Sequence, residues 1–271
     1  MITDIVRPKT VAEAVRAKTA PGAAFLGGGT WLNSGRAEDV TILVSLENLG
    51  LDSIQNESAG YRGAAEAGRC NIGASVTFQA LVDGALVPSG LRAAALLTAS
   101  RTLRNMVTVG GELGLSPDDS ALIPVLIVLG AEVSVAGKRK PLPIESFLDE
   151  GRTGLVLGVS VPSRLVAAVR AVSRTSHSPR SLVAAVSARA AGPVLEQPRL
   201  VLSDCRGLRV RLTSAEQKLD GAPLPSRQDI EKLARAEFSP AADVHASVTY
   251  KRYMAGVMVA DLLAALANEA A

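Results

Sequence analysis

Two glycine clusters constrain the fold of this chain more than any other feature of its sequence. Gly27-Gly28-Gly29 follows a short apolar run, Ala23 to Leu26, and Gly110-Gly111 follows Thr108-Val109. Glycine has no Cβ, so the backbone can adopt positive φ and a ligand can approach the main chain closely. Successive N–H groups in such loops can converge on phosphate oxygens. Two loops of this kind predict a site that holds the pyrophosphate of a dinucleotide from both sides.

Taken singly, neither loop identifies a ligand. Each is also what a tight turn at the end of a strand looks like, and neither matches the Gly-x-Gly-x-x-Gly fingerprint or a P-loop. No serine occupies a nucleophile elbow. Glu112 and Asp118-Asp119 are more typical of acids near helix N-termini than of a metal cluster. The sequence therefore predicts no catalytic residue and no metal site.

Composition excludes several classes of protein. Hydrophobic residues make up 48% of the 271 residues, which indicates a globular chain of one large or two smaller domains. Aromatic residues make up only 3%, which argues against stacking on nucleic-acid bases. Cys70 and Cys205 lie far apart with no His or Cys close by, so iron–sulfur and zinc spacings are lacking. A net charge of +3 from scattered arginines suits an anionic small molecule.

No segment of the sequence predicts export or a membrane anchor. The N-terminus has no basic segment followed by an apolar run, as a signal peptide would. The longest apolar stretch, Ala121 to Leu129, is too short to span a bilayer. We expect a soluble cytoplasmic protein that contacts neither membrane nor nucleic acid.

The pattern of apolar residues predicts an α+β fold in two parts. Thr10-Val-Ala-Glu13 is a capping box that begins the first helix, and Thr77 caps a second helix that extends to Asp83. Further helices are expected at 91–98, 120–129, 226–236 and from 247 onward, and strands at 23–26, 41–46, 71–76, 131–136, 155–161, 165–172, 182–188 and 199–203. Pro162-Ser163 marks the expected boundary, which gives domains at 1–163 and 164–271.

Several motifs, in order and at matching spacing, resemble one known family over nearly the whole chain. They are Arg7-Pro8-Lys-Thr10-Val-Ala-Glu13, Leu26-Gly27-Gly28-Gly29-Thr30-Trp31-Leu32, Ile72-Gly73-Ala74 with Val76-Thr77, Arg104-Asn105 with Thr108-Val109-Gly110-Gly111, Leu129-Gly130-Ala131-Glu132-Val133, Ser173-Arg174, and Ser247-Val-Thr-Tyr250-Lys-Arg252. This series resembles the FAD-binding subunit, or middle domain, of the xanthine dehydrogenase and carbon monoxide dehydrogenase family of molybdopterin hydroxylases.

The resemblance implies a fold, a cofactor and partners. It implies a two-part FAD-binding domain of the PCMH type at 1–163 and a small α+β domain of the CO dehydrogenase flavoprotein type at 164–271. It implies FAD as the cofactor of an oxidoreductase subunit that takes electrons one at a time from [2Fe–2S] clusters and passes them to an acceptor, often NAD. The expected partners are a [2Fe–2S] small subunit and a molybdopterin large subunit in a hetero-oligomer. The residues assigned to the flavin by this resemblance are Leu26, Gly27, Gly28, Gly29, Thr30, Trp31, Leu32, Thr98, Thr108, Val109, Gly110, Gly111, Glu112, Ser120, Val156 and Arg170.

At three positions the chain departs from the family pattern. Glu112 stands where relatives carry Asn, Trp31 where Asp is common, and Ala121, preceded by Ser120, where many carry an Asp that contacts the flavin's sugar chain. Arg170 falls where relatives often place a flavin-contacting Lys. Two alternative functions stay open: a structural or assembly subunit that has lost FAD, and a stand-alone flavin-dependent NADH oxidoreductase.

Overall fold

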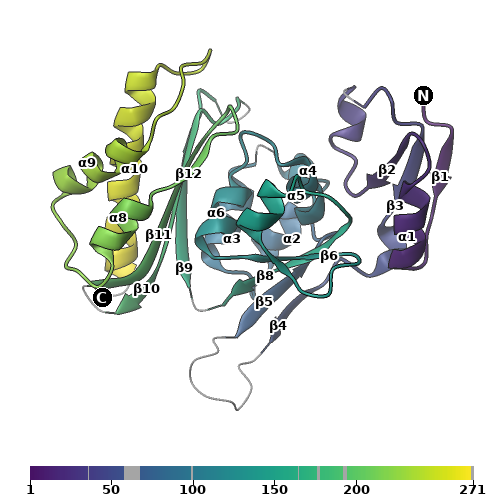
Figure 1. Ribbon diagram of the computed structural model, residues 1–271, viewed down its shortest axis with the longest axis horizontal. Helices are drawn as coiled ribbons and strands as arrows, with labels where there is room; N and C mark the ends of the chain where they lie inside the picture. The colour runs from purple at the N-terminus through teal and green to yellow at the C-terminus, as the bar shows by residue number, and fades with distance from the viewer. Residues whose placement is uncertain are drawn as a thin grey trace. The chain divides into compact units, whose positions relative to one another are not determined.

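The computed structural model describes residues 1–271 except 36, 58–67, 99, 164, 176–177, 192–193 and 270–271. The described residues form two compact units that alternate along the sequence. The first unit comprises Met1–Val87, Ser100–Ser116 and Ala131–Val161, and the second comprises Pro88–Ala99, Pro117–Gly130 and Pro162–Ala271. Both units combine helices with sheets, which confirms the α+β class (Figure 1). The domain division at residue 163 stays a prediction.

The first unit begins with a small parallel sheet in the order β1-β3-β2. Its elements are β1 (Asp4–Val6), α1 (Val11–Lys18), β2 (Ala23–Leu26), η1 (Leu32–Ser34), β3 (Ile42–Ser45) and η2 (Glu47–Leu49). Thr10 caps α1 as expected, because its Oγ1 accepts from the Glu13 N–H at 3.2 Å. Apolar side chains of α1, β2 and β3 pack together in one core with Leu155. The first glycine loop follows β2 directly, so it is attached to a strand whose side chains are packed in this core.

The first unit continues with a five-stranded sheet in the order β4-β5-β8-β6-β7. Its strands are β4 (Ile54–Glu57), β5 (Arg69–Gly73), β6 (Glu132–Val135), β7 (Leu142–Pro143) and β8 (Val156–Pro162), and its helices are α2 (Phe78–Asp83), α4 (Arg101–Arg104), α5 (Val109–Leu115) and α7 (Ile144–Asp149). Thr77 caps α2 by accepting from the Ala80 N–H at 3.1 Å, as the sequence predicts. The second glycine loop forms the first turn of α5.

The second unit is an antiparallel sheet, in the order β12-β11-β10-β9, with helices on both faces. Its elements are α3 (Ser89–Leu96), α6 (Leu122–Val128), β9 (Val166–Val172), β10 (Leu182–Ala191), β11 (Val194–Asp204), β12 (Arg209–Arg211), α8 (Thr213–Leu219), α9 (Arg227–Glu237) and α10 (Val248–Glu269). Leu182, Ala184 and Val186 pack with residues of α10, whereas Ser187 Oγ donates to the Val128 carbonyl of α6. Helices α3 and α6 therefore cover the opposite face from α10 (Figure 1), although they precede residue 163.

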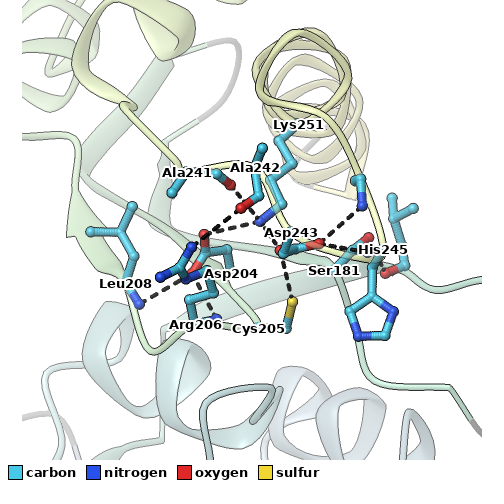
Figure 2. Close-up of polar contacts among 12 residues, drawn as sticks. Ser181, Asp204, Cys205, Arg206, Leu208, Ala241, Ala242, Asp243, His245 and Lys251 are labelled. Carbon is cyan, nitrogen blue, oxygen red and sulfur yellow. Dashed lines mark hydrogen bonds and ion pairs between the residues drawn. The ribbon is translucent and has the colours of Figure 1, made fainter.

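A buried group of charged side chains joins α10 to the loop before it and to the end of β11 (Figure 2). Lys251 is 0% exposed, and its Nζ donates to Asp204 Oδ2 at 3.1 Å, to the Ala241 carbonyl at 3.0 Å and to Asp243 Oδ2. Burial alone would raise the pKa of Asp243, but the hydrogen bonds from Lys251 and Cys205 outweigh it and hold that pKa well below its usual range. We call Lys251, Asp204, Asp243 and Cys205 the lysine cluster.

The backbone completes the lysine cluster. Asp204 Oδ1 accepts from the N–H groups of Arg206 at 3.0 Å and Leu208 at 3.2 Å. Asp243 Oδ1 accepts from those of His245 at 2.8 Å and Ala246 at 3.0 Å. Each carboxylate is therefore bonded to one turn of main chain and to Lys251, so the cluster fixes two loops of the second unit.

Cys205 is expected to react slowly with alkylating reagents in the folded protein. Burial, together with its 3.1 Å hydrogen bond to Asp243, raises the pKa of this thiol to about 11. Because only the thiolate is nucleophilic, about a thousandth of Cys205 is reactive at pH 8. Burial also raises the pKa of Cys70. Iodoacetamide labelling followed by peptide mass spectrometry should therefore label neither thiol quickly in the native protein and both in guanidinium chloride. Rapid labelling of native Cys205 would contradict the hydrogen bond to Asp243.

Among helices of the described residues, none has both the length and the apolar character that a membrane span requires.

Candidate functional site

A cavity of about 380 Å³ lies in the first unit and is lined by both glycine loops. The predicted site residues that line it are Gly27, Gly28, Gly29, Thr30, Trp31, Leu32, Thr108, Gly110, Gly111, Glu112 and Val156. Its size falls in the range of small-molecule sites, and its lining is mostly apolar with a few polar groups, as such sites usually are. The structure thus brings together two motifs that lie about 80 residues apart in the sequence.

The two glycine clusters lie directly against other main chain. A Cβ built on Gly28 would lie 1.4 Å from the Met106 carbonyl oxygen, just before the second loop, and one on Gly110 would lie 2.7 Å from the Ala74 Cβ. Of these glycines only Gly29 has positive φ, at +71°. The expectation that Gly28 and Gly110 serve to admit a ligand and to adopt positive φ is therefore corrected: both are required first by close packing of backbone on backbone.

The first glycine loop offers free hydrogen-bond donors. Within the described part of the chain, the backbone N–H groups of Gly28, Gly29 and Thr30 make no hydrogen bond. The carbonyl of Gly29 accepts from the Asn33 N–H at 3.0 Å, so the loop is held by its acceptors and leaves its donors unused. Unused N–H groups at a cavity wall are suited to bind an anionic group such as phosphate.

The second glycine loop differs, because its donors are already used. Gly110 N–H donates to the Ala74 carbonyl at 2.7 Å, and Gly111 N–H donates to Thr108 Oγ1 at 3.1 Å, which caps α5. Glu112 N–H donates to the Thr108 carbonyl at 2.9 Å. The symmetrical grip expected from the sequence is therefore revised. The first loop supplies donors, whereas the second packs closely against Ala74, which follows β5, and forms part of the cavity wall.

Glu112, the departure in the second motif, is one of the residues that line the cavity. It is 9% exposed and belongs to the first turn of α5. A carboxylate there would disfavour additional negative charge on a ligand close to it. Glu112, which stands where the family pattern has Asn, thus lies beside the cavity in which a cofactor would bind.

Five predicted site residues are not in the cavity wall as described. Leu26 ends β2, and Val109, which is 1% exposed, is packed in the first turn of α5. Thr98, Ser120 and Arg170 belong to the second unit.

Two of these residues have structural partners inside the second unit. Ser120 Oγ accepts from the Ile123 N–H at 3.2 Å at the start of α6, beside the buried Ala121. Arg170 forms an ion pair with Asp261 of α10, which also binds Arg227 at 2.7 Å. Their assignment to the flavin, like that of Thr98, stays a prediction.

Sequence analysis did not single out the other residues of the cavity wall. They are Ala24, Phe25, Leu46, Ala74, Val107, Gly114, Leu115, Gly154 and Leu155. Four of them belong to β2 or α5, and most are apolar residues that carry no pattern of their own. Only Ala74 lies in a quoted motif, and its role became visible through its contact with Gly110. Across the described ranges, no three His, Cys, Asp or Glu side chains gather as a metal ion would need.

Comparison with known families identifies this arrangement. The family model described as the FAD binding domain in molybdopterin dehydrogenase matches residues 1–164. The chain belongs to this family. A second model, the CO dehydrogenase flavoprotein C-terminal domain, matches residues 167–266. The resemblance inferred from the motifs is thereby confirmed, and FAD is the cofactor of this molybdopterin dehydrogenase flavoprotein.

Individual relatives are similar to this flavoprotein in sequence or structure over nearly its full length. The uncharacterized protein YgfM of Escherichia coli (strain K12) is 33% identical over 97% of this chain and 96% of its own. Carbon monoxide dehydrogenase from Hydrogenophaga pseudoflava is similar in structure, with a TM-score of 0.86 at 23% identity over 100% of this chain and 99% of that chain. Quinoline 2-oxidoreductase from Pseudomonas putida 86 gives 0.84 at 19% identity over 100% and 98%. The last two likenesses establish the shared fold.

The cavity has the groups that FAD requires. The unused N–H groups of Gly28, Gly29 and Thr30 can hold the pyrophosphate, and the backbone of Gly110 and Gly111 lines the same cavity. Bound FAD supplies the redox chemistry, and the protein positions it and adjusts its electrostatic surroundings.

Proposed function

We propose that this chain is the FAD-binding electron-transfer subunit of a molybdenum hydroxylase complex. In this role, a molybdopterin large subunit oxidises the organic substrate, and a [2Fe–2S] small subunit passes the electrons to the flavin. Bound FAD would supply the transfer of these electrons to an acceptor such as NAD. The complex is a hetero-oligomer and acts in the cytoplasm.

One observation carries the proposal. A loop with unused N–H donors faces a cavity in a chain whose two segments match, in order, the FAD-binding and C-terminal domains of such flavoproteins. Two features of the chain give further support. Its two cysteines are 135 positions apart, at 70 and 205, so it does not itself supply the ligands of a [2Fe–2S] cluster. Its structural likeness to a carbon monoxide dehydrogenase and to quinoline 2-oxidoreductase is consistent with a role beside subunits that carry the other centres.

The residues of this chain bind and orient, and the cofactor carries the electrons. Gly28, Gly29 and Thr30 hold the pyrophosphate through their backbone N–H groups. Thr108 keeps the first turn of α5 in place by accepting from Gly111 N–H. Glu112 places a carboxyl group in the residues that line the cavity. No side chain of this chain is assigned a bond-making or bond-breaking role.

The purified chain is expected to bind one FAD and to be inactive as a hydroxylase on its own. Denaturation should release FAD, identified by chromatography, because a cavity with two loops suits a dinucleotide. Purines, aldehydes and N-heterocycles should not reduce the flavin of the isolated chain under anaerobic conditions. The same substrates should reduce it once the chain is copurified with its [2Fe–2S] and molybdopterin subunits.

Two controls make this experiment decisive. NADH is added anaerobically to the isolated chain and should bleach the flavin if NAD is the acceptor. If NADH does not bleach the flavin, electron transfer from the reduced flavin to an artificial dye is measured for comparison. Release of FMN alone would contradict the proposed cofactor site. Substrate oxidation by the isolated chain, free of other subunits, would contradict the assignment as an electron-transfer subunit.

A further inference from the structure

One aromatic side chain of the cavity wall, that of Trp31, is among the exposed large hydrophobic side chains of the described residues. Two aromatic residues line the cavity, Phe25 and Trp31. Phe25 packs against the core of the small parallel sheet. Trp31 is 37% exposed, and its indole N–H makes no hydrogen bond within the described residues. A large apolar ring left open to solvent at a ligand cavity is more typical of a binding surface than of a packed core.

The main chain holds Trp31 in a defined position. Its carbonyl accepts from the Ser34 N–H at 3.0 Å and from Ser34 Oγ at 2.7 Å. Its own backbone is helical, with φ −77° and ψ −41°, at the start of η1. The preceding Gly29 turns the chain with φ +71°, and its carbonyl is bonded to Asn33. The ring is therefore attached to a fixed turn, on the residue that follows Thr30 of the glycine loop.

This position fits a planar ring of the cofactor. If Gly28, Gly29 and Thr30 hold the pyrophosphate, both ring systems of FAD extend from that point, one on each side. An indole fixed beside the pyrophosphate can stack on one of them, and stacking removes apolar area of both rings from water. Trp31 stands where the family pattern has Asp, so this contact would be particular to this chain and its like.

We propose that Trp31 stacks on a planar ring of the bound flavin nucleotide and supplies part of its affinity. The inference rests on the proposed FAD site and adds an aromatic contact to its phosphate contacts. Stacking of a base on an aromatic side chain typically contributes enough for truncation to Ala to weaken binding about tenfold. Phe, which retains a ring, should retain most of the affinity.

The test compares nucleotide binding by full-length wild type, Trp31→Ala, Trp31→Phe and Leu86→Ala. Leu86 is an exposed apolar residue of the same unit, 54% exposed, that does not line the cavity, so its variant controls for loss of surface apolar area. Dissociation constants for FAD, FMN and ADP are measured by titration of the flavin-free protein, with circular dichroism as a check on folding. Trp31 is the only tryptophan of the chain, so the decay of tryptophan fluorescence reports on this ring alone.

The expected result is FAD binding about tenfold weaker in Trp31→Ala and near wild type in Trp31→Phe and Leu86→Ala. In the wild type, bound FAD should remove most tryptophan emission by contact quenching. The fluorescence of Trp31 should then decay far faster than energy transfer from Trp31 to the flavin alone would cause. A loss shared by FAD and ADP assigns the contact to adenine, and a loss shared by FAD and FMN assigns it to isoalloxazine. Equal FAD affinity in wild type and Trp31→Ala overturns the inference and leaves the proposed function intact. A wild-type chain that binds no FAD overturns both.

Discussion

Gly28→Ala is expected to weaken FAD binding by about 100-fold while the second unit keeps its fold. The added Cβ would lie 1.4 Å from the Met106 carbonyl oxygen, whereas real Cβ contacts are essentially never shorter than 3.0 Å. One main chain must therefore move by at least 1.6 Å, the difference between these distances. A shift of the first loop displaces its N–H donors, and a misplacement of about 1 Å in a functional site can cost about two orders of magnitude.

The matched control for Gly28→Ala is Gly114→Ala. Gly114 also lines the cavity, but a Cβ there would meet nothing within 4 Å. It lies in α5, where Ala is preferred to Gly by about 1 kcal/mol, so this variant should be as stable as wild type or more so. Flavin affinity is measured by fluorescence titration and unfolding by urea. Wild-type affinity in Gly28→Ala would mean that the loop does not pack on Met106.

Lys251→Met is expected to lower the free energy of unfolding by about 3–5 kcal/mol, the usual result of removing one partner from a buried ion pair. The substitution keeps the apolar length of the side chain and removes its charge. Asp204 and Asp243, whose side chains are 1% and 9% exposed, would then be two buried carboxylates without the cation that binds both. The loops that they hold through backbone N–H groups would lose their common anchor.

Lys232→Met is the matched control for Lys251→Met. Lys232 is 74% exposed and pairs with Asp229 at 3.5 Å on the surface of α9. An exposed pair of this kind contributes about 0–1 kcal/mol, so the control should change little. Urea unfolding at neutral pH measures both variants. A loss below about 1 kcal/mol for Lys251→Met would mean that the lysine cluster does not hold the loops.

The pH dependence of unfolding gives an independent check on Lys251→Met. The folded pKa of Asp243 is lowered, so its contribution to stability is present above the pKa of an unfolded carboxyl, about 4, and is lost as pH falls further. The difference between wild type and Lys251→Met should therefore shrink on acidification below about pH 4. A difference that stays constant with pH would point to lost packing and not to lost charge.

Features that depend on neighbouring residues in the sequence could be predicted. Thr10 and Thr77 cap their helices as expected, because capping involves residues three positions apart. The strands β9 and β10 also occur where long apolar runs predict them, whereas β11 begins at Val194, five residues before the run at 199–203 that predicts it. Short strands were missed. β1 has two exposed residues out of three, and β12 is only half-buried, so neither has an apolar alternation to detect.

Features that depend on distant residues could not be predicted from local pattern. The partners of Lys251 lie 47 and 8 residues away, and nothing in their spacing indicates a buried cluster. The motif order predicted which glycines share a site. It did not predict that the N–H donors of the first loop are unused, or that those of Gly110 and Gly111 are occupied by Ala74 and by the Thr108 cap. Only the folded backbone determines which N–H groups remain available.

The alternation of the two units along the chain has a consequence for synthesis on the ribosome. All seven residues of α6 are buried, and they pack in the second unit with strands made later. Val128 ends α6, whereas β11 is complete only at Asp204, 76 residues on. At synthesis rates of roughly 5–20 residues per second, this apolar helix waits roughly 4–15 s for the sheet that covers it. The nascent chain therefore has a prolonged period in which α6 is open to chaperones or to aggregation. Synonymous codon changes that slow translation between residues 129 and 204 should lower the soluble yield without altering the finished protein.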